Sequence, residues 1–190
     1  MNYIIIFDRI KHSPNRPLNF TRIFSQVIKK SLYLDTSVPS YYYDQRKDLD
    51  IRYRRKVARD WWTNEKDSFD LYISELVVVA LQRGNYPQKE KIIRLVKGLS
   101  ILPIVSEIEA IVQDYMKNYL MPSTDMGDAF HLAYASFYKI DYLLTWNCNH
   151  LANVNKKEHI ETINRKLKLF VPEIITPLQL FKETGDKNER

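Results

Sequence analysis

The sequence is poor in residues that several common protein classes require. Its 190 residues include a single cysteine, Cys148, and only four glycines. One cysteine excludes a disulfide framework and is typical of a reducing cytosol. With so few glycines there is no glycine-rich phosphate loop, which excludes P-loop and dinucleotide-binding proteins. The Gly-x-Ser-x-Gly elbow of α/β-hydrolases is also missing.

Long apolar runs are missing as well. No run approaches the roughly 20 residues that a membrane-spanning helix needs. Residues 3–7 are apolar but too short for the core of a signal peptide, and Asp8 follows at once. The four histidines show no spacing of the His-Glu-x-x-His type, which argues against a zinc hydrolase. We therefore expect a cytoplasmic protein that does not associate with membranes.

The positive charge is concentrated at the N-terminus. The formal net charge is +6, and residues 1–30 contribute six basic side chains against Asp8 alone. The rest of the chain is therefore close to neutral. Two interpretations of the basic segment stay open: it attracts nucleic-acid phosphates, or it is a solvated extension. The same alternatives apply to the arginine cluster at residues 52–59, which nearby aspartates dilute.

Alternating strand and helix patterns predict an α/β fold. Stretches rich in apolar residues predict strands at 31–35, 69–73, 142–145 and 173–177, and a short strand or an extended link at 100–105. Helical patterns occupy 41–67, 75–83, 88–97, 106–120, 124–138 and 156–168. This alternation predicts a mainly parallel sheet with helices on both faces. We assign residues 1–30 to a basic N-terminal extension, 31–181 to one domain and 182–190 to a polar C-terminal tail.

Three local signals mark helix ends. Ser74 precedes a helical stretch and is a predicted N-cap. Ser106 and Glu109 match a capping box, which predicts a helix that starts just after Ser106. Gly84 follows a helical stretch in the manner of a C′ glycine.

Two separated carboxylates are predicted to share one edge of the sheet. Asp35 ends a predicted buried strand, and ligands and metal ions bind at that edge in open α/β sheets. Asp128 lies one turn before Leu132 on the core-facing side of its helix, where a carboxylate needs a donor or a cation. We predict that both bind one metal ion. Asp125 is a further candidate ligand, although its place near the helix N-terminus favours a first-turn charge.

The chemistry of these side chains points to phosphodiester hydrolysis. Oxygen ligands without a Cys/His cluster suit Mg²⁺ or Mn²⁺ and not zinc. An ion held by a few carboxylates leaves positions for water and a phosphate oxygen, where it generates hydroxide and stabilises the leaving oxygen. A phosphatase with Asp35 as nucleophile is a weaker alternative, because Ser37 stands where a second Asp is needed.

Four segments carry a family resemblance: Leu34–Ser37, Ile73–Val77, Asp128–Ala133 and Leu144–Leu151. Their order and spacing resemble PIN domains, and especially the VapC-like toxins of prokaryotic toxin–antitoxin modules. The resemblance runs from about residue 31 to residue 181. It implies a three-layer α/β/α fold and a Mg²⁺- or Mn²⁺-dependent endoribonuclease. It also implies a homodimer that a cognate antitoxin protein inhibits.

The resemblance also assigns roles to single residues. Asp35 and Asp128 match metal-binding aspartates, and Thr145 and Asn147 match the polar residues after the fourth strand. Two positions depart from the family pattern: Ala80 stands where a Glu is common, and His150 occupies the last acidic position.

Glu75 does not obviously replace the carboxylate that Ala80 lacks. It lies five residues before Ala80, which is about 140° round the helix. Loss of acidic ligands lowers the affinity for divalent cations, so the resemblance implies weakened activity.

Two functional hypotheses follow. In the first, the protein is a metal-dependent endoribonuclease and toxin that acts on RNA. Asp35 and Asp128 bind the metal, and Asn147 or His150 positions water or phosphate. In the alternative, motivated by Ala80 and His150, the protein is a catalytically degenerate PIN domain that binds RNA or a protein partner.

Overall fold

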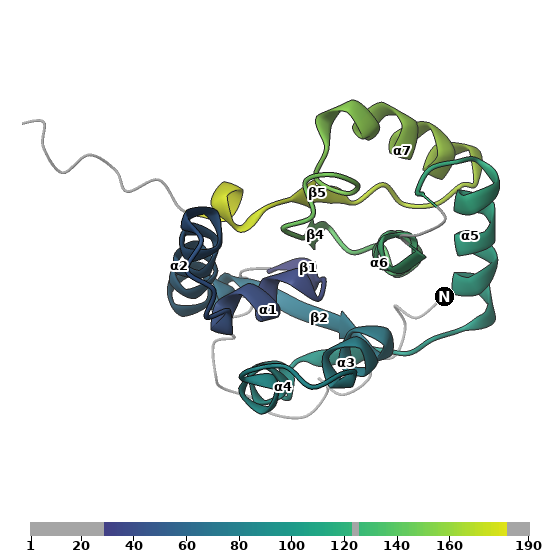
Figure 1. The fold of residues 1–190 in the computed structure, drawn as a ribbon. Coiled ribbons are helices and arrows are strands. Elements are labelled where there is room, and N and C mark those ends of the chain that lie inside the picture. The colour runs from purple at the N-terminus through teal and green to yellow at the C-terminus, as the bar shows by residue number, and fades with distance from the viewer. Residues whose placement is uncertain (1–28, 123–125, 182–190) are drawn as a thin grey trace, which may run out of the picture.

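A five-stranded parallel sheet forms the centre of the computed structural model (Figure 1). The structure describes residues 29–122 and 126–181. The strands are β1 (Lys30–Leu34), β2 (Phe69–Ser74), β3 (Ser100–Leu102), β4 (Tyr142–Leu144) and β5 (Glu173–Ile175). They lie in the order β3-β2-β1-β4-β5, and every neighbouring pair is parallel. The predicted α/β fold with a parallel sheet is confirmed.

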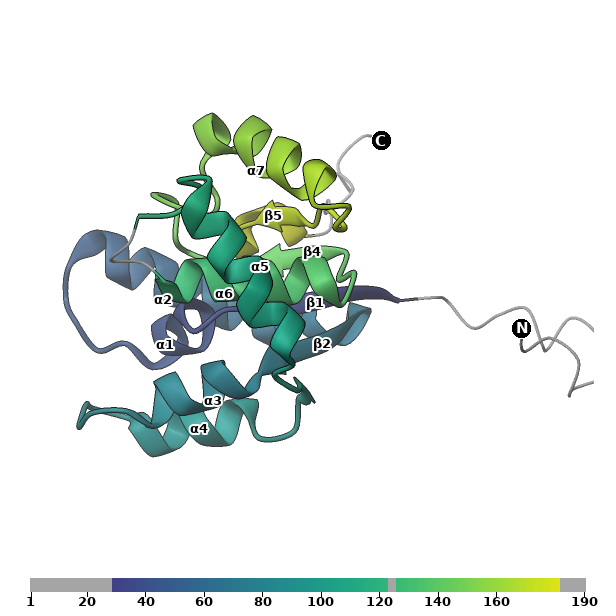
Figure 2. The same ribbon diagram turned by 90° about the vertical axis from the view of Figure 1, so that its right-hand side faces the viewer.

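Helices cover both faces of this sheet. They are α1 (Ser37–Tyr43), α2 (Leu49–Asn64), α3 (Glu75–Gln82), α4 (Lys89–Val96), α5 (Ser106–Lys117), α6 (Met126–Phe137) and α7 (Val154–Lys166). The chain crosses the sheet in one direction from β1 to β3 and in the other from β3 to β5, so right-handed crossovers put α1–α4 and α5–α7 on opposite faces. Figure 1 shows α2 on the left of the strands and α5 on the right, and in Figure 2 α5 and α6 lie in front while α2 lies behind. The fold is therefore the three-layer α/β/α arrangement.

The register of the sheet brings the ends of three strands level. Leu34 of β1 pairs with Leu144 of β4, and Leu144 pairs with Ile175 of β5. Asp35 follows Leu34 and Thr145 follows Leu144, so these two residues lie side by side at the carboxyl edge of the sheet.

Within the described ranges, no helix combines the length and apolar character of a membrane span.

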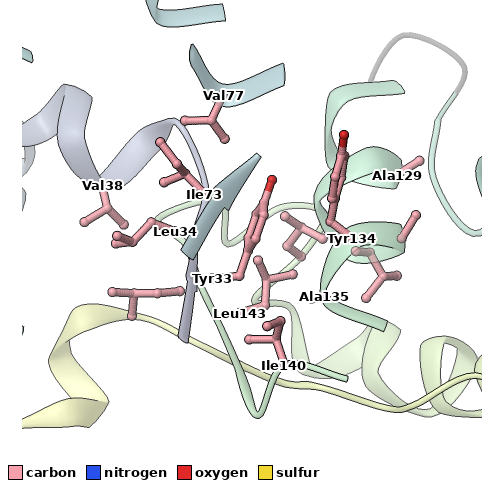
Figure 3. Close-up of a cluster of buried hydrophobic side chains, with 14 of the residues drawn as sticks. Tyr33, Leu34, Val38, Ile73, Val77, Ala129, Tyr134, Ala135, Ile140 and Leu143 are labelled. Atoms are coloured by element: carbon pink, nitrogen blue, oxygen red, sulfur yellow. The ribbon is translucent and has the colours of Figure 1, made fainter. Parts of the chain in front are cut away.

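Strand β1 contacts both helical layers because its side chains alternate between the two faces. Leu32, Tyr33 and Leu34 are fully buried. Figure 3 shows Tyr33 alongside Tyr134 of α6, whereas Leu34 lies toward Val38 of α1. The packing on both faces thus fixes strand β1, and it also fixes the position of Asp35, which follows the strand.

Two of the three predicted helix-end signals are confirmed. The hydroxyl of Ser74 accepts a hydrogen bond from the amide of Val77 at 3.3 Å and caps α3. Gly84 follows α3 with a φ of +71°, the left-handed conformation that glycine adopts without strain. The capping box is wrong: Val105 is the N-cap of α5, and the Ser106 hydroxyl bonds to the side chain of Glu107.

The single helix predicted over residues 41–67 is also wrong at its start. The chain forms α1, leaves the helical conformation at Asp44, and begins α2 at Leu49. Interactions at Asp44 stabilise this break. Its carboxylate pairs with Arg46 at 2.5 Å, and its carbonyl accepts from Arg55 at 2.6 Å. Periodicity alone does not reveal such a break, because the polar and charged residues 44–48 also fit the solvated face of a helix.

A buried polar network joins α5, α6 and α7. The hydroxyl of Tyr115 donates to Oδ1 of Asn164 at 2.5 Å and lies within hydrogen-bond distance, 3.3 Å, of the Ser136 hydroxyl. The amide nitrogen of Asn164 donates to Ser136 at 2.9 Å and to the carbonyl of Phe170 at 3.0 Å. Buried polar groups are costly unless they are satisfied, so this network specifies how the three helices pack.

We predict that Tyr115→Phe lowers the free energy of unfolding by about 1–3 kcal/mol, because buried Asn164 loses its donor. Urea denaturation followed by circular dichroism measures this change. Tyr119→Phe is the matched control, because Tyr119 is 88% exposed and its change should stay within about 0.5 kcal/mol. Equal stability of both variants and the wild type would contradict the role of the network.

Candidate functional site

Asp35 is buried at the carboxyl edge of the sheet with donors on both of its carboxylate oxygens. It is only 2% exposed. Its Oδ1 accepts the amide of Ser37 at 2.8 Å and the hydroxyl of Ser37 at 2.5 Å. Its Oδ2 accepts the hydroxyl of Thr145. The carboxylate is therefore oriented by two segments that are distant in the sequence.

Each of these hydroxyls is itself oriented by a backbone amide. The amide of Trp146 donates to the Ser37 hydroxyl at 2.8 Å. The amide of Asn147 donates to the Thr145 hydroxyl, also at 2.8 Å. Because each hydroxyl oxygen accepts from an amide, its own proton is directed to Asp35. Two successive amides of the loop after β4 thus act on the two oxygens of one carboxylate.

Asn147 connects this group to Asp128. Its side-chain nitrogen donates to Oδ2 of Asp128 at 2.6 Å. Its side-chain oxygen accepts the amides of Asn149 and His150, each at 3.1 Å. Asp35 and Asp128 are therefore linked through Thr145 and Asn147 at the edge of the sheet.

The structure brings the predicted catalytic residues into this one neighbourhood. Asp128, Asn147 and His150 are half-buried, and Asp35 is buried. Asp125, the further candidate ligand, lies outside the described residues. Proximity places these side chains together without assigning their roles, so the metal-binding and catalytic assignments stay predictions.

The chemistry of the two aspartates suits a hard divalent cation. A carboxylate offers about four lone-pair sites, and Asp35 uses three of them for Ser37 and Thr145. Counting the contacts of the described residues, one site on Oδ2 therefore remains. Among the described residues, no group of three or more His, Cys, Asp or Glu is placed to hold a metal ion. Mg²⁺ is commonly bound by one or two carboxylates plus waters and substrate phosphates, which matches two aspartates.

Ala80 is exposed near the C-terminal end of α3. It lines a pocket of about 470 Å³ together with Thr36 and Ser40 of the segment that follows Asp35, whereas Asp35 and Asp128 themselves do not line it. Glu75 is exposed at the start of α3 and does not line this pocket. Burial raises the pKa of Tyr134 on α6 to about 12, and the charge of Glu75 adds to this effect.

A second buried network lies directly behind Asp35. The hydroxyl of Tyr33 hydrogen-bonds with the Ser74 hydroxyl at 2.8 Å and with Nδ1 of His131 at 3.0 Å. Tyr33 and Ser74 have no exposed surface, and His131 is buried. Burial raises the pKa of Tyr33, and the charge of Asp35 adds to this effect. The network joins β1, β2 and α6, so it fixes the helix that carries Asp128.

The family model of the PIN domain matches residues 32–157, from the strand before Asp35 to the start of α7. The chain belongs to the PIN domain family. A comparison with curated proteins found no match. PIN domains are generally nucleases that use divalent metal ions, and the paired aspartates of this PIN domain lie within the matched residues.

Sequence reasoning missed two residues of this PIN domain site. The sequence places Ser37 in a family segment and in the position of a second Asp, but it does not indicate that Ser37 is a partner of Asp35. The Asp35 carboxylate accepts the amide of Ser37, as in an Asx-turn, and the Ser37 hydroxyl adds a second contact. For the cluster at residues 52–59, which includes Arg54, the sequence leaves phosphate binding and a solvated helix face open, but Arg54 is half-buried and donates to the carbonyl of Trp146 at 3.2 Å. That contact joins positions 92 residues apart, so no local sequence pattern could have predicted it.

We predict that His131 makes the stability of this PIN domain fall with decreasing pH. Burial lowers the pKa of His131, against an opposing effect of Asp35. Below the unfolded value of about 6.5, the unfolded chain therefore binds more protons than the folded chain. The free energy of unfolding should fall as the pH drops below that value. Urea denaturation between about pH 7.5 and pH 5 measures this loss.

The His131→Gln variant tests the assignment. It should show a weaker fall in stability over the same pH interval, because the titrating group is gone. His159→Gln is the control, since His159 is exposed on α7 and its removal should leave the pH dependence of the wild type. Identical pH profiles for His131→Gln and the wild type would contradict the assignment.

Proposed function

We propose that this PIN domain is a Mg²⁺- or Mn²⁺-dependent endoribonuclease and the toxin of a toxin–antitoxin module. The observation that supports this proposal is the linkage of Asp35 and Asp128 through Thr145 and Asn147. Two carboxylates held together at the carboxyl edge of a parallel sheet are suited to a divalent ion and a phosphate.

The proposed mechanism assigns one task to each residue. Asp35 and Asp128 would hold the ion, which supplies a nucleophilic hydroxide and charge stabilisation when bound. Ser37 and Thr145 hold the Asp35 carboxylate in one orientation. Asn147 holds Asp128 through the hydrogen bond from its side-chain nitrogen. The His150 backbone is attached to the Asn147 side chain, and its imidazole would orient water or a phosphate oxygen.

The substrate and partners are also part of the proposal. The four segments that resemble VapC-like toxins support RNA as the substrate, a cognate antitoxin as the inhibitor and a homodimer as the assembly. The reduced number of acidic ligands supports weak activity, because the affinity of a site for divalent ions depends on ligand charge.

A second candidate function is a PIN domain that binds RNA or a protein without cleaving it. Ala80 favours this alternative, because it leaves the site without the Glu that the family commonly carries. The absence of any group of three acidic, His or Cys ligands among residues 29–122 and 126–181 favours it too. Calorimetric titration with Mn²⁺ separates the two functions: micromolar to low-millimolar binding supports the nuclease, and no binding supports the binding module.

We predict that the wild type cleaves RNA only when Mg²⁺ or Mn²⁺ is present, and that Asp35→Asn abolishes cleavage. The substitution keeps the size of the side chain but removes its charge. It also converts an oxygen that accepts from a hydroxyl into a nitrogen that does not. Cleavage of a labelled RNA, with and without a chelator, measures the effect. Undiminished activity in Asp35→Asn would remove Asp35 from the mechanism.

Lys97→Gln is the control for this experiment, because it removes an exposed charge between α4 and the start of β3, at the amino edge of the sheet. It should cleave RNA at the rate of the wild type. The same proteins test the toxin role when they are expressed in bacteria. The wild type and Lys97→Gln should arrest growth, and Asp35→Asn should not. Arrest by Asp35→Asn would separate toxicity from cleavage.

We predict that Ala80→Glu strengthens Mn²⁺ binding, because it adds a carboxylate to the side of α3 that shares a pocket with Thr36. The expected gain is about tenfold or more, the size of other changes around metal sites. Calorimetry measures it. Val79→Glu adds the same charge at the neighbouring exposed position of α3 and should leave the affinity within about twofold. An equal gain in both variants would show that net charge, and not position, is responsible.

A further inference from the structure

Arg54 of α2 is held in an unusual position for a residue of a charged helix. Its guanidinium lies 5.3 Å from the centre of the Tyr41 ring and 5.5 Å from that of the Trp146 ring. Nη1 donates to the Tyr41 hydroxyl at 3.3 Å and to the carbonyl of Trp146 at 3.2 Å. The two rings and two acceptors define its orientation, and holding a long side chain still costs rotamer entropy.

The carbonyl that Arg54 contacts belongs to the same peptide group that acts on Thr145. In a trans peptide the C=O and the following N–H point in opposite directions. The C=O of Trp146 accepts from Arg54, while the N–H of Asn147 donates to the Thr145 hydroxyl at 2.8 Å. That hydroxyl then donates to Oδ2 of Asp35. A continuous chain of hydrogen bonds therefore runs from a cation to a carboxylate.

We propose that Arg54 is a positioning residue for Asp35, acting through the Trp146–Asn147 peptide and the Thr145 hydroxyl. A charged donor at one end polarises the peptide, and each following donor in the chain becomes stronger. The Thr145 hydroxyl is thereby held on one lone pair of Oδ2, and the other lone pair of Oδ2 stays available to a ligand of the site. The inference deepens the proposed function and rests on it for its metal-binding consequence.

A purely structural role is the alternative. Arg54 then only ties α2 to the loop after β4, and Thr145 has no part in its effect. The two explanations differ in one respect: the relay needs the Thr145 hydroxyl, and the structural tie does not. Arg59 offers a matched control, because it donates to the carbonyl of Tyr42 at 2.8 Å and lies 5.6 Å from the Tyr42 ring. Asp35 has no contact with Tyr42 among its hydrogen bonds.

The first experiment observes the relay directly by nuclear magnetic resonance of the metal-free protein. Arg54→Gln should shift the amide resonance of Asn147 and speed its hydrogen exchange. Arg54→Lys keeps the charge, so both changes at the Asn147 amide should be smaller in this variant than in Arg54→Gln. Arg59→Gln should leave the Asn147 amide unchanged. An Asn147 amide that does not respond to Arg54→Gln would overturn the inference.

The second experiment is a double-mutant cycle on Mn²⁺ affinity measured by calorimetry. Arg54→Gln should weaken binding by about tenfold, the lower end for groups that support metal ligands. In a Thr145→Val background, the same substitution should change the affinity less than about twofold, because the relay is already broken. Additive effects of the two substitutions would overturn the inference in favour of the structural tie. Thermal melting checks that each variant is folded.

The two experiments also separate this inference from the proposed function. A wild type that neither binds Mn²⁺ nor cleaves RNA would end the proposed function, while the Asn147 amide would still decide whether the relay exists. A wild type that binds and cleaves, with an Asn147 amide indifferent to Arg54, would end the inference and leave the function standing.

Discussion

The double hydroxyl contact on Asp35 is the interaction on which the site depends. A carboxylate that is almost fully buried needs donors to offset its desolvation. Here Ser37 supplies them from its own segment and Thr145 from the neighbouring strand. Both hydroxyls are directed by successive amides of one loop. This arrangement requires β1 and β4 to be adjacent and in register, so the topology of the sheet and the geometry of the site are one constraint.

The packing behind the site explains how Asp128 reaches the same neighbourhood. Alternation along β1 turns Tyr33 toward α6, opposite to the face on which Leu34 meets α1 (Figure 3). There Tyr33 joins Ser74 of β2 and His131 of α6 in a buried network. Such networks specify one arrangement, because each unsatisfied polar group would be costly. The helix that carries Asp128 is thereby attached to the two central strands of the sheet.

The small number of carboxylates limits the affinity that the site could have for a divalent ion. With Asp35 and Asp128 as the acidic ligands, an ion would depend on water and on the phosphates of the substrate for the rest of its coordination. Its affinity in the absence of substrate would then be low, and its occupancy would follow the substrate. Ala80 lines a pocket with Thr36, the residue that follows Asp35, and a carboxylate at position 80 would add negative charge there.

Much of this protein is determined by local sequence. The strands, the order of the elements, the Ser74 cap and the Asp at the end of β1 follow from hydrophobic periodicity and capping chemistry, which act over a few residues. The break between α1 and α2 does not, because contacts of Arg46 and Arg55 with Asp44 stabilise it. Nor does the chain of contacts from α2 to Asp35, since hydrogen bonds between residues about a hundred positions apart exist only once the sheet has aligned its strand ends. Local sequence thus determined which chemical groups stand at the strand ends. Tertiary structure determined which of these groups contact one another, because packing and strand register set the partners of side chains that are far apart in the sequence.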